Sequence, residues 1–266
     1  MSSDVSCPSL RPPNSCYLPA RRYAATDLAP GVYHLAMARE RAVLIAENLR
    51  IPKEALTFEG FRKWVHTPEF PETGRIDYLA GDVEIDMSPE DLHTHGIVKV
   101  AITSALNAVV TEPDLGEIFV DRTRVVSRFA TLSVEPDVVV VLWESLQTGR
   151  VRYVPAASQE PDRYVEIEGA PDVVVEVVSD GSVKKDTQRL PALYARAGIP
   201  ELWIADTRDE ETLRFEIHTL RDGEYVPVEP DAEGWLESKR LGVSFRLTRR
   251  KTRMGTWGYR LESLYP

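Results

Sequence analysis

The stretch that decides the fold is PDVVVEVVS, residues 171–179, in which five valines surround one glutamate. Runs of β-branched residues of this length are typical of strands that are buried on both faces. Because side chains alternate along a strand, Glu176 shares a face with Val174 and Val178. A carboxylate in such a place is costly unless a cation or hydrogen-bond donors compensate it. We therefore expect a positive group beside Glu176.

A second valine-rich stretch, PDVVVVLW at residues 136–143, begins with Asp137. If the two strands are neighbours, Asp137 and Glu176 converge on one hard cation, which prefers oxygen ligands. The natural use of such a site is a metal-activated water that attacks a phosphodiester. The structural alternative is a buried Glu176 that pairs with Arg or Lys. For Asp172, which opens the other strand, we favour a hydrogen-bonding role at the strand start over metal binding.

The sequence around these strands predicts a mixed α/β arrangement. RIDYLAGDVEID, residues 75–86, is typical of a hairpin with Gly81 in the turn, and residues 90–110 repeat apolar positions at helical spacing. Strands are expected at 117–121 and 123–129. A helix that Gly198 terminates is followed by the strand ELWIAD, which predicts a right-handed parallel crossover. Tyr194 and Trp203 are interpreted as core residues.

The two ends of the chain are expected to be accessory parts. Residues 35–49 show a helical pattern, Thr57 is a plausible N-cap for a further helix, and residues 1–30 are expected to form a leader. From residue 212 onward the pattern predicts an antiparallel meander that turns at Asp222-Gly223. Residues 149–159 are polar and irregular, which favours a loop near the mouth of the site.

Composition limits the class of protein. The apolar runs fall far below the roughly 20 residues of a membrane span, and the N-terminus does not resemble a secretory signal, so we expect no membrane partner and a cytoplasmic setting. Cys7 and Cys16 are too few and too poorly placed for a disulfide framework or a thiolate-zinc site. The formal charge of -10 argues against a broad basic surface. If DNA is the substrate, its binding must be local.

These stretches resemble the Uma2 family of restriction-endonuclease-like proteins. The resemblance rests on PDVVVEVVS, on a basic segment with Asp186, on LPALYARAGIPELWIAD, and upstream on GDVEIDMSP, His95 and PDVVVV. It covers residues 56–206 and implies the fold of the PD-(D/E)XK nuclease superfamily. That is an α/β (α+β) fold with a restriction-endonuclease-like mixed central β-sheet flanked by helices, here with a C-terminal antiparallel β-extension.

The resemblance also implies a magnesium site. It places metal ligands at Asp137, at Glu176 and at the backbone carbonyl of Val177, and an upstream family glutamate falls on Asp77, a shorter acid. Mg²⁺ or Mn²⁺ would serve phosphodiester hydrolysis. The usual lysine is missing, because its two family positions hold Val178 and Leu190.

Replacement cations stand close by in the sequence, at Lys184, Lys185 and Arg189. Lys185 is the first choice as the assisting cation, while the alternative is that this cluster is a solvated helix start. Arg189 can stabilise phosphate charge, but it stays protonated and cannot act as a base.

Three functions are compatible with these residues. The first is a metal-dependent endonuclease that hydrolyses DNA with Asp137, Glu176, Lys185 and Asp77. The second is a catalytically impaired nuclease-fold module that binds nucleic acid or a protein partner, and the third is a hydrolase of another phosphorylated substrate. We expect three parts, a leader with an accessory helix (1–55), a nuclease-like core (56–206) and a β meander packed on it (207–266), and a homodimer by analogy.

Overall fold

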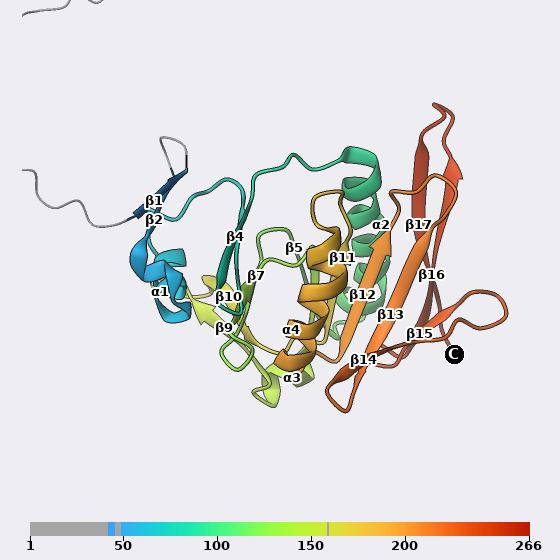
Figure 1. Cartoon of the computed structure of the whole chain (residues 1–266). Helices are drawn as coiled ribbons and strands as arrows, with labels where there is room; N and C mark the ends of the chain where they lie inside the picture. Colours follow the sequence, from blue (N-terminus) through green and yellow to red (C-terminus); the bar gives the residue numbers. More distant parts are fainter. Residues whose placement is uncertain (1–41, 46–48, 159) are drawn as a thin grey trace, which may run out of the picture. The chain divides into compact units, whose positions relative to one another are not determined.

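The computed structural model describes residues 42–45, 49–158 and 160–266, and these residues belong to one compact unit. Two six-stranded sheets organise this unit, and a three-stranded sheet and a two-stranded pair accompany them (Figure 1). No helix within the described ranges is long and apolar enough to cross a membrane.

The central sheet has the strand order β14-β13-β12-β11-β8-β5. Strand β11 lies between β8, which is antiparallel to it, and β12, which is parallel to it, so the sheet is mixed. The strands are β5 (Gly116–Val120), β8 (Val138–Leu142), β11 (Val173–Val177), β12 (Glu201–Asp206), β13 (Arg214–Arg221) and β14 (Glu224–Pro227).

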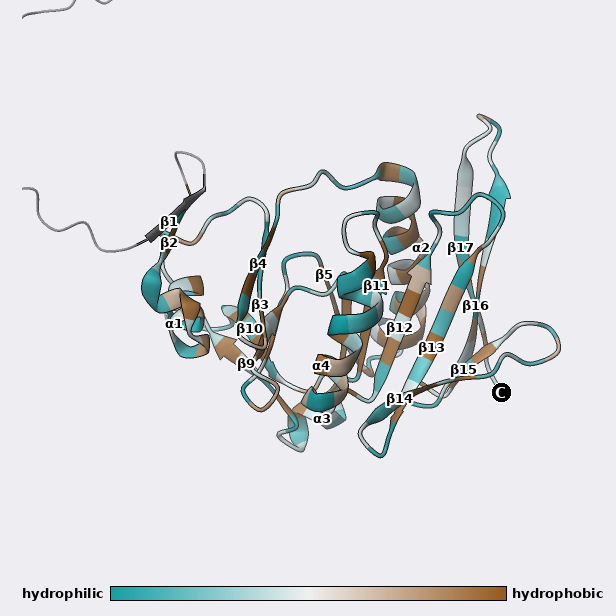
Figure 2. Cartoon of the chain, viewed as in Figure 1, coloured by the Kyte–Doolittle hydropathy of each residue, from teal (hydrophilic) through white to brown (hydrophobic). Residues whose placement is uncertain are grey.

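Strand β11 is buried on both faces, as its sequence predicts. Val173, Val175 and Val177 belong to one hydrophobic core, while Val174 and Val178 belong to the other. Figure 2 shows the middle of this sheet in the brown of hydrophobic residues. The alternation that places Glu176 among apolar neighbours is therefore confirmed.

Helices cover both faces of the central sheet. Helix α2 (Ile97–Leu106), which π-helical turns extend at Leu92–Gly96 and Asn107–Thr111, packs on the face of Val175. Helix α4 (Leu190–Ala197) follows the turn Lys185–Arg189 and packs on the opposite face. Gly198 ends α4 with φ of 80°, which glycine adopts without strain. The predicted parallel crossover from β11 through α4 to β12 is confirmed.

The second six-stranded sheet carries the predicted hairpin. Its order is β4-β3-β7-β6-β10-β9, and β3 and β4 pair across Gly81. The strands are β3 (Arg75–Leu79), β4 (Asp82–Asp86), β6 (Arg124–Ser127), β7 (Leu132–Val134), β9 (Val151–Pro155) and β10 (Tyr164–Gly169). Residues of β6, β7 and β10 share the hydrophobic core of α4, so this sheet packs on the α4 side.

The remaining elements are two short helices and a separate C-terminal sheet. Thr57 caps α1 (Phe58–Val65) by accepting a hydrogen bond from the Gly60 amide, as predicted, and α3 (Trp143–Gln147) follows β8. The predicted C-terminal meander is divided between two sheets, because β13 and β14 extend the central sheet while β15 (Leu236–Ser238), β16 (Val243–Lys251) and β17 (Trp257–Leu264) form their own.

Two predictions are wrong in the described residues. The expected helix over 35–49 contains β1 (Ala42–Ile45), which pairs with β2 (Leu49–Pro52), because a short apolar run fits a paired strand as well as a helix. The expected loop over 149–159 contains β9, whose pairing with β10 orders it. Residues 35–41, the leader, Cys7 and Cys16 lie outside the described residues. The three-part division of the chain stays a prediction.

Candidate functional site

The structure brings Asp137 and Glu176 together at one end of the central sheet. Strands β8 and β11 are antiparallel with Val138 opposite Val175, so the next step of this register sets Asp137 opposite Glu176. Side chains directly opposite each other have Cβ atoms about 4.5–5.5 Å apart. The amide of Val177 donates a hydrogen bond to Asp137 Oδ2 at 2.7 Å. Both carboxylates are 1% exposed, so they form a buried acid pair.

Asp137 is held ionised by two basic side chains. Arg75, at the start of β3, donates from Nη2 to Asp137 Oδ1 at 2.8 Å, and His95 Nε2 lies 3.3 Å from Oδ2. Burial alone would raise the pKa of Asp137, but the His95 hydrogen bond and the Arg75 charge hold this pKa well below its usual range. Glu90 accepts from the other His95 nitrogen at 2.8 Å, which orients the ring.

Glu176 is in the opposite electrostatic situation. The Tyr194 hydroxyl donates to Oε1 at 2.5 Å, but Oε2 has no hydrogen-bond partner among the described residues. Burial first, and then the nearby charges of Asp186 and Asp137, raise the pKa of Glu176 well above its ordinary value. The site is therefore short of positive charge at Glu176 Oε2.

Asp186 adds a further buried acid next to Glu176. Its Oδ2 accepts a hydrogen bond from the Ser182 hydroxyl, while Oδ1 has no partner among the described residues. Burial raises the pKa of Asp186 to about 6. Two carboxylate oxygens without partners thus occur in one small region. Buried polar atoms almost always have a hydrogen-bond partner, so this arrangement points to a ligand or an ion.

Lys185 lies in the site, with Nζ 3.4 Å from Asp77 Oδ2. Burial would lower the pKa of Lys185, but the charge of Asp77 outweighs it together with those of Glu176 and Asp186, so the amine stays protonated. Asp77 is itself buried and accepts the Glu135 amide at 3.1 Å. Sequence reasoning named both residues, and the structure places them beside the acid pair.

The two usual lysine positions are filled by the core. Val178 and Leu190 are both buried in the hydrophobic cluster on the α4 face. A lysine at either position would replace apolar packing.

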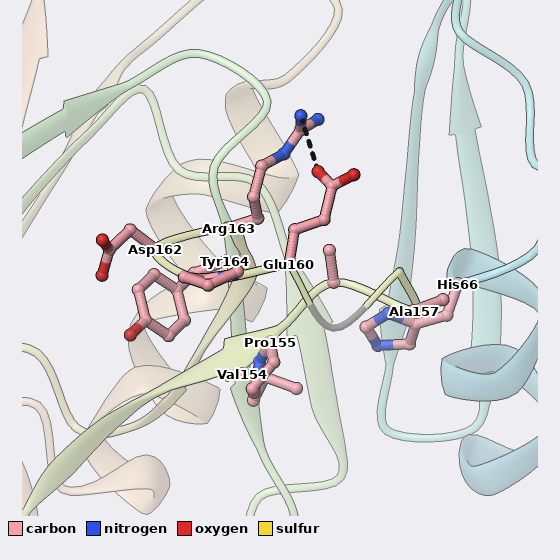
Figure 3. Close-up of a pocket in the computed structure, with 10 residues that line it drawn as sticks. His66, Val154, Pro155, Ala157, Glu160, Asp162, Arg163 and Tyr164 are labelled. Atoms are coloured by element: carbon pink, nitrogen blue, oxygen red, sulfur yellow. Dashed lines mark hydrogen bonds and ion pairs between the residues drawn. The ribbon is translucent and has the colours of Figure 1, made fainter.

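Two adjoining hollows open beside the acid pair, onto the residues that contact Asp137 and onto Lys185. One of about 330 Å³ is lined by Arg75, Glu90, His95 and Lys99, among others. The other, of about 170 Å³, is lined by Arg75, Asp77 and Lys185, among others. Arg75 lines both hollows, and its charge reaches Asp137, Glu176 and Asp77. A separate hollow of about 550 Å³ at the β9–β10 end, lined by His66 and Tyr164, contains none of the predicted site residues (Figure 3).

The donor set fits a small, hard cation. No cluster of three or more His, Cys, Asp or Glu side chains with metal-binding geometry occurs in the described part of the chain. Mg²⁺ is usually bound by only one or two carboxylates together with waters, so the pair Asp137 and Glu176 is sufficient. The unpartnered Oε2 of Glu176 is the oxygen that a cation would satisfy.

Sequence reasoning missed three contributors to this site. Arg75 begins a strand and carries no pattern that marks it. Tyr194 was interpreted as core, yet its hydroxyl contacts Glu176, and the only available signal was its helical spacing on the sheet-facing side of α4. Lys99, one helical turn after His95, forms salt bridges with Glu90 and Asp121. Asp172 lies at the other end of β11, where it accepts the Leu142 amide as expected.

The mixed central sheet, with helices on both of its faces, has the arrangement expected for a restriction-endonuclease-like fold. The model of the Uma2 family, described as "Putative restriction endonuclease", matches residues 58–250, and the chain belongs to this family. The predicted family is therefore confirmed.

A solved structure supports the fold. It is described as a putative nuclease belonging to DUF820 from Anabaena variabilis, and it is 21% identical to this chain with a TM-score of 0.50. The match covers 70% of this chain and 90% of that chain. No functionally curated protein matches the sequence. The predicted restriction-endonuclease-like fold is confirmed.

Proposed function

We propose that this protein is a metal-dependent endonuclease that hydrolyses phosphodiester bonds of DNA. The observation that carries the proposal is the buried acid pair with one carboxylate oxygen, Glu176 Oε2, left without a partner in the described residues. Membership of a family of restriction-endonuclease-like proteins supports the same class of reaction.

Asp137 and Glu176 would hold Mg²⁺ or Mn²⁺, and the carbonyl of Val177 would be a third ligand. When bound there, the cation would lower the pKa of a coordinated water and neutralise charge on the phosphate. Arg75 would leave Asp137 Oδ1 to the cation and turn its guanidinium toward the phosphate, since it already lines both hollows.

Lys185 would supply the positive charge that the family lysine normally supplies. Its protonated amine can stabilise the charge that develops on phosphate oxygens in the transition state. Asp77 would hold Lys185 in place through the 3.4 Å contact. His95, oriented by Glu90, would keep its contact with Asp137 Oδ2 and hold that carboxylate in place.

The test is cleavage of supercoiled plasmid and single-stranded DNA with Mg²⁺ or Mn²⁺. We expect cleavage by the native protein and a loss of at least about 10²-fold in Asp137→Asn and Glu176→Gln. Asp172→Asn, at the other end of β11, is the matched control and keeps its activity if it folds. Two results would overturn the proposal. One is no cleavage with either metal, and the other is cleavage by both site variants at the rate of the native protein.

A specific observation favours the second candidate, a catalytically impaired module that binds nucleic acid or a protein. Both usual lysine positions are buried apolar residues, so the site depends on Lys185 and Arg75 for positive charge. DNA binding without cleavage in the same assay would favour this candidate. A cytoplasmic location and a homodimer stay predictions, and size-exclusion chromatography with light scattering tests the dimer.

A further inference from the structure

We propose that the turn end of the β16–β17 hairpin is an arm that binds the phosphate backbone of the nucleic-acid substrate. The inference rests on the proposed function for its choice of partner, and it adds a binding surface that lies outside the acid pair. We define the basic arm as Arg249, Arg250, Lys251, Arg253 and Arg260.

The basic arm is an exception in an acidic chain. Residues 247–261 hold these five cations and no Asp or Glu, although the chain as a whole has a formal charge of -10. Within the described residues, none of the five forms a salt bridge. Most other arginines among the described residues have acidic partners, as Arg246 does with Glu262 on the same hairpin. Figure 2 shows the end of β16 in the teal of hydrophilic residues.

The hairpin presents these cations rather than burying them. Arg250, Lys251, Arg253 and Arg260 are exposed. Trp257, opposite Lys251 in the β16–β17 register, holds two cations against its ring. The Arg249 guanidinium lies 4.5 Å and the Lys251 amine 3.8 Å from the ring centroid. Cation–π contacts of this kind fix long side chains in one orientation, so a charged surface is held ready for a partner.

The basic arm lies at the same end of the central sheet as the acid pair. Strands β11 and β12 are parallel with Val177 opposite Ala205, so both end at the edge where Glu176 lies. The segment after β12 accepts hydrogen bonds from Arg249 at two carbonyls, those of Asp209 and Glu210, at 2.9 and 2.7 Å. The arm is thus anchored to the loop that leaves the sheet beside the site.

Helix α2 also links the basic arm to the acid pair. Arg260 and Ile97 line a common hollow of about 670 Å³ between β17 and α2. Ile97 is two residues beyond His95, which contacts Asp137. In Figure 1 the hairpin rises beside the first turns of α2. Nucleic acid bound over the hollow that Arg75 and His95 line would therefore continue onto the arm.

The side-chain chemistry favours a polyphosphate over a lipid surface. Membrane-surface segments combine basic residues with exposed Trp, Phe or Leu that enter the acyl boundary. Here the tryptophan of the hairpin is covered by two cations, and Met254 is the large apolar side chain exposed at the tip. Closely spaced cations with no acidic neighbour match the regular charge of a phosphodiester backbone.

The test uses the full chain in EDTA, so that binding is measured without cleavage. The variant Arg250→Gln/Lys251→Gln/Arg253→Gln removes three charges of the basic arm. The matched control Lys63→Gln/Arg221→Gln/Lys239→Gln removes three exposed charges from α1, from the last residue of β13 and from the loop after β15. Thermal unfolding of both variants checks that each is folded.

Binding of a fluorescent 30-base-pair duplex is measured across a range of NaCl concentrations. We expect the arm variant to lower the slope of log K against log salt by about 2.7, or about 0.9 for each phosphate that is no longer neutralised, and to raise the Kd at 0.1 M NaCl at least roughly tenfold. The control stays within about twofold of the native protein. Equal weakening in both variants, unchanged binding by the arm variant, or no DNA binding by the native protein would overturn the proposal.

A parallel experiment uses vesicles that contain phosphatidylglycerol. If the arm variant no longer binds vesicles while its duplex binding is unchanged, the partner is a membrane and the proposal fails. The failure of this proposal can be distinguished from the failure of the proposed function. Cleavage that needs Asp137 and Glu176 but not the arm leaves the proposed function standing, whereas arm-dependent binding without cleavage leaves the arm standing.

Discussion

The substitution Glu176→Gln should stabilise the metal-free protein. Glu176 is buried, and neither its Oε2 nor the Oδ1 of the neighbouring Asp186 has a donor in the described residues. The amide group of Gln would supply a donor in the same volume while Tyr194 keeps its hydrogen bond to the remaining oxygen. An unsatisfied buried group costs about 1–3 kcal/mol, so we expect a gain of that size. For a chain of this length, this corresponds to a rise in Tm of about 2–12 °C.

The same substitution should remove the stabilisation by metal. A ligand at 100 times its Kd stabilises the folded state by about 2.7 kcal/mol. Titration of Mg²⁺ should therefore raise the Tm of the native protein and leave that of Glu176→Gln unchanged. The assay is thermal unfolding followed by circular dichroism at pH 7.5, first in EDTA and then over a range of Mg²⁺ concentrations.

Glu201 on the adjacent strand gives a matched control. It is equally buried, but its oxygens accept the Ser238 hydroxyl at 2.7 Å and the Arg240 amide at 2.8 Å. Glu201→Gln would turn a donor toward these donors and should lose about 1–3 kcal/mol with or without metal. The reasoning is refuted if Glu176→Gln destabilises the metal-free protein as Glu201→Gln does, or if Mg²⁺ stabilises Glu176→Gln as much as the native protein.

Three further predictions test other parts of the account. Lys185→Gln should lower kcat for plasmid cleavage by about 10²-fold, because it removes a charge at the site, whereas Lys184→Gln, with an exposed side chain, should change kcat less than twofold. Burial would raise the pKa of Glu166, but His66 and Arg62 together hold it below its ordinary value of 4.5. The ionised Glu166 therefore stabilises the fold above about pH 4.5, and this contribution is lost as the pH falls through the lowered pKa. Glu166→Gln should lower the free energy of unfolding in urea by about 3–5 kcal/mol at pH 7, and by progressively less below about pH 4.5. Gly169→Ala should lower the Tm measurably, because φ is 120° and the new Cβ would lie 2.2 Å from the Arg150 carbonyl oxygen; an unchanged Tm would contradict this.

Much of the central sheet could be predicted because its strands carry a strong local signal. Five valines around Glu176 specify a strand buried on two faces, and the cost of burying a lone carboxylate identifies Glu176 as unusual. Gly198 and Gly81 mark the ends of a helix and a hairpin for equally local reasons. These features need no knowledge of the tertiary partner.

The parts that could not be predicted depend on partners distant in the sequence. Arg75 becomes a site residue only because the β3 strand begins beside Asp137, 62 positions away. Strand β9 is ordered by pairing with β10, and the polar sequence of residues 149–159 gives no sign of that pairing. Tyr194 has the spacing of a core residue, and only its buried contact with Glu176 reveals its polar role.

The sequence also leaves two interpretations of Lys185 open. The sequence predicts a cation near the start of α4, but a solvated helix start has the same composition. The fold largely buries this side chain and places its amine 3.4 Å from Asp77, while the role of Lys185 as the assisting cation stays a prediction. Leu190, at one of the two positions where the resemblance places the lysine, is buried in the hydrophobic core on the α4 face.

The most direct test of the central claim is an anomalous difference map from crystals grown with Mn²⁺. We predict one strong peak about 2.1 Å from a carboxylate oxygen of Asp137 and from Oε2 of Glu176, with the Arg75 guanidinium displaced from Asp137. A map with no peak at this pair, with Arg75 still bound to Asp137 at millimolar Mn²⁺, would contradict the account.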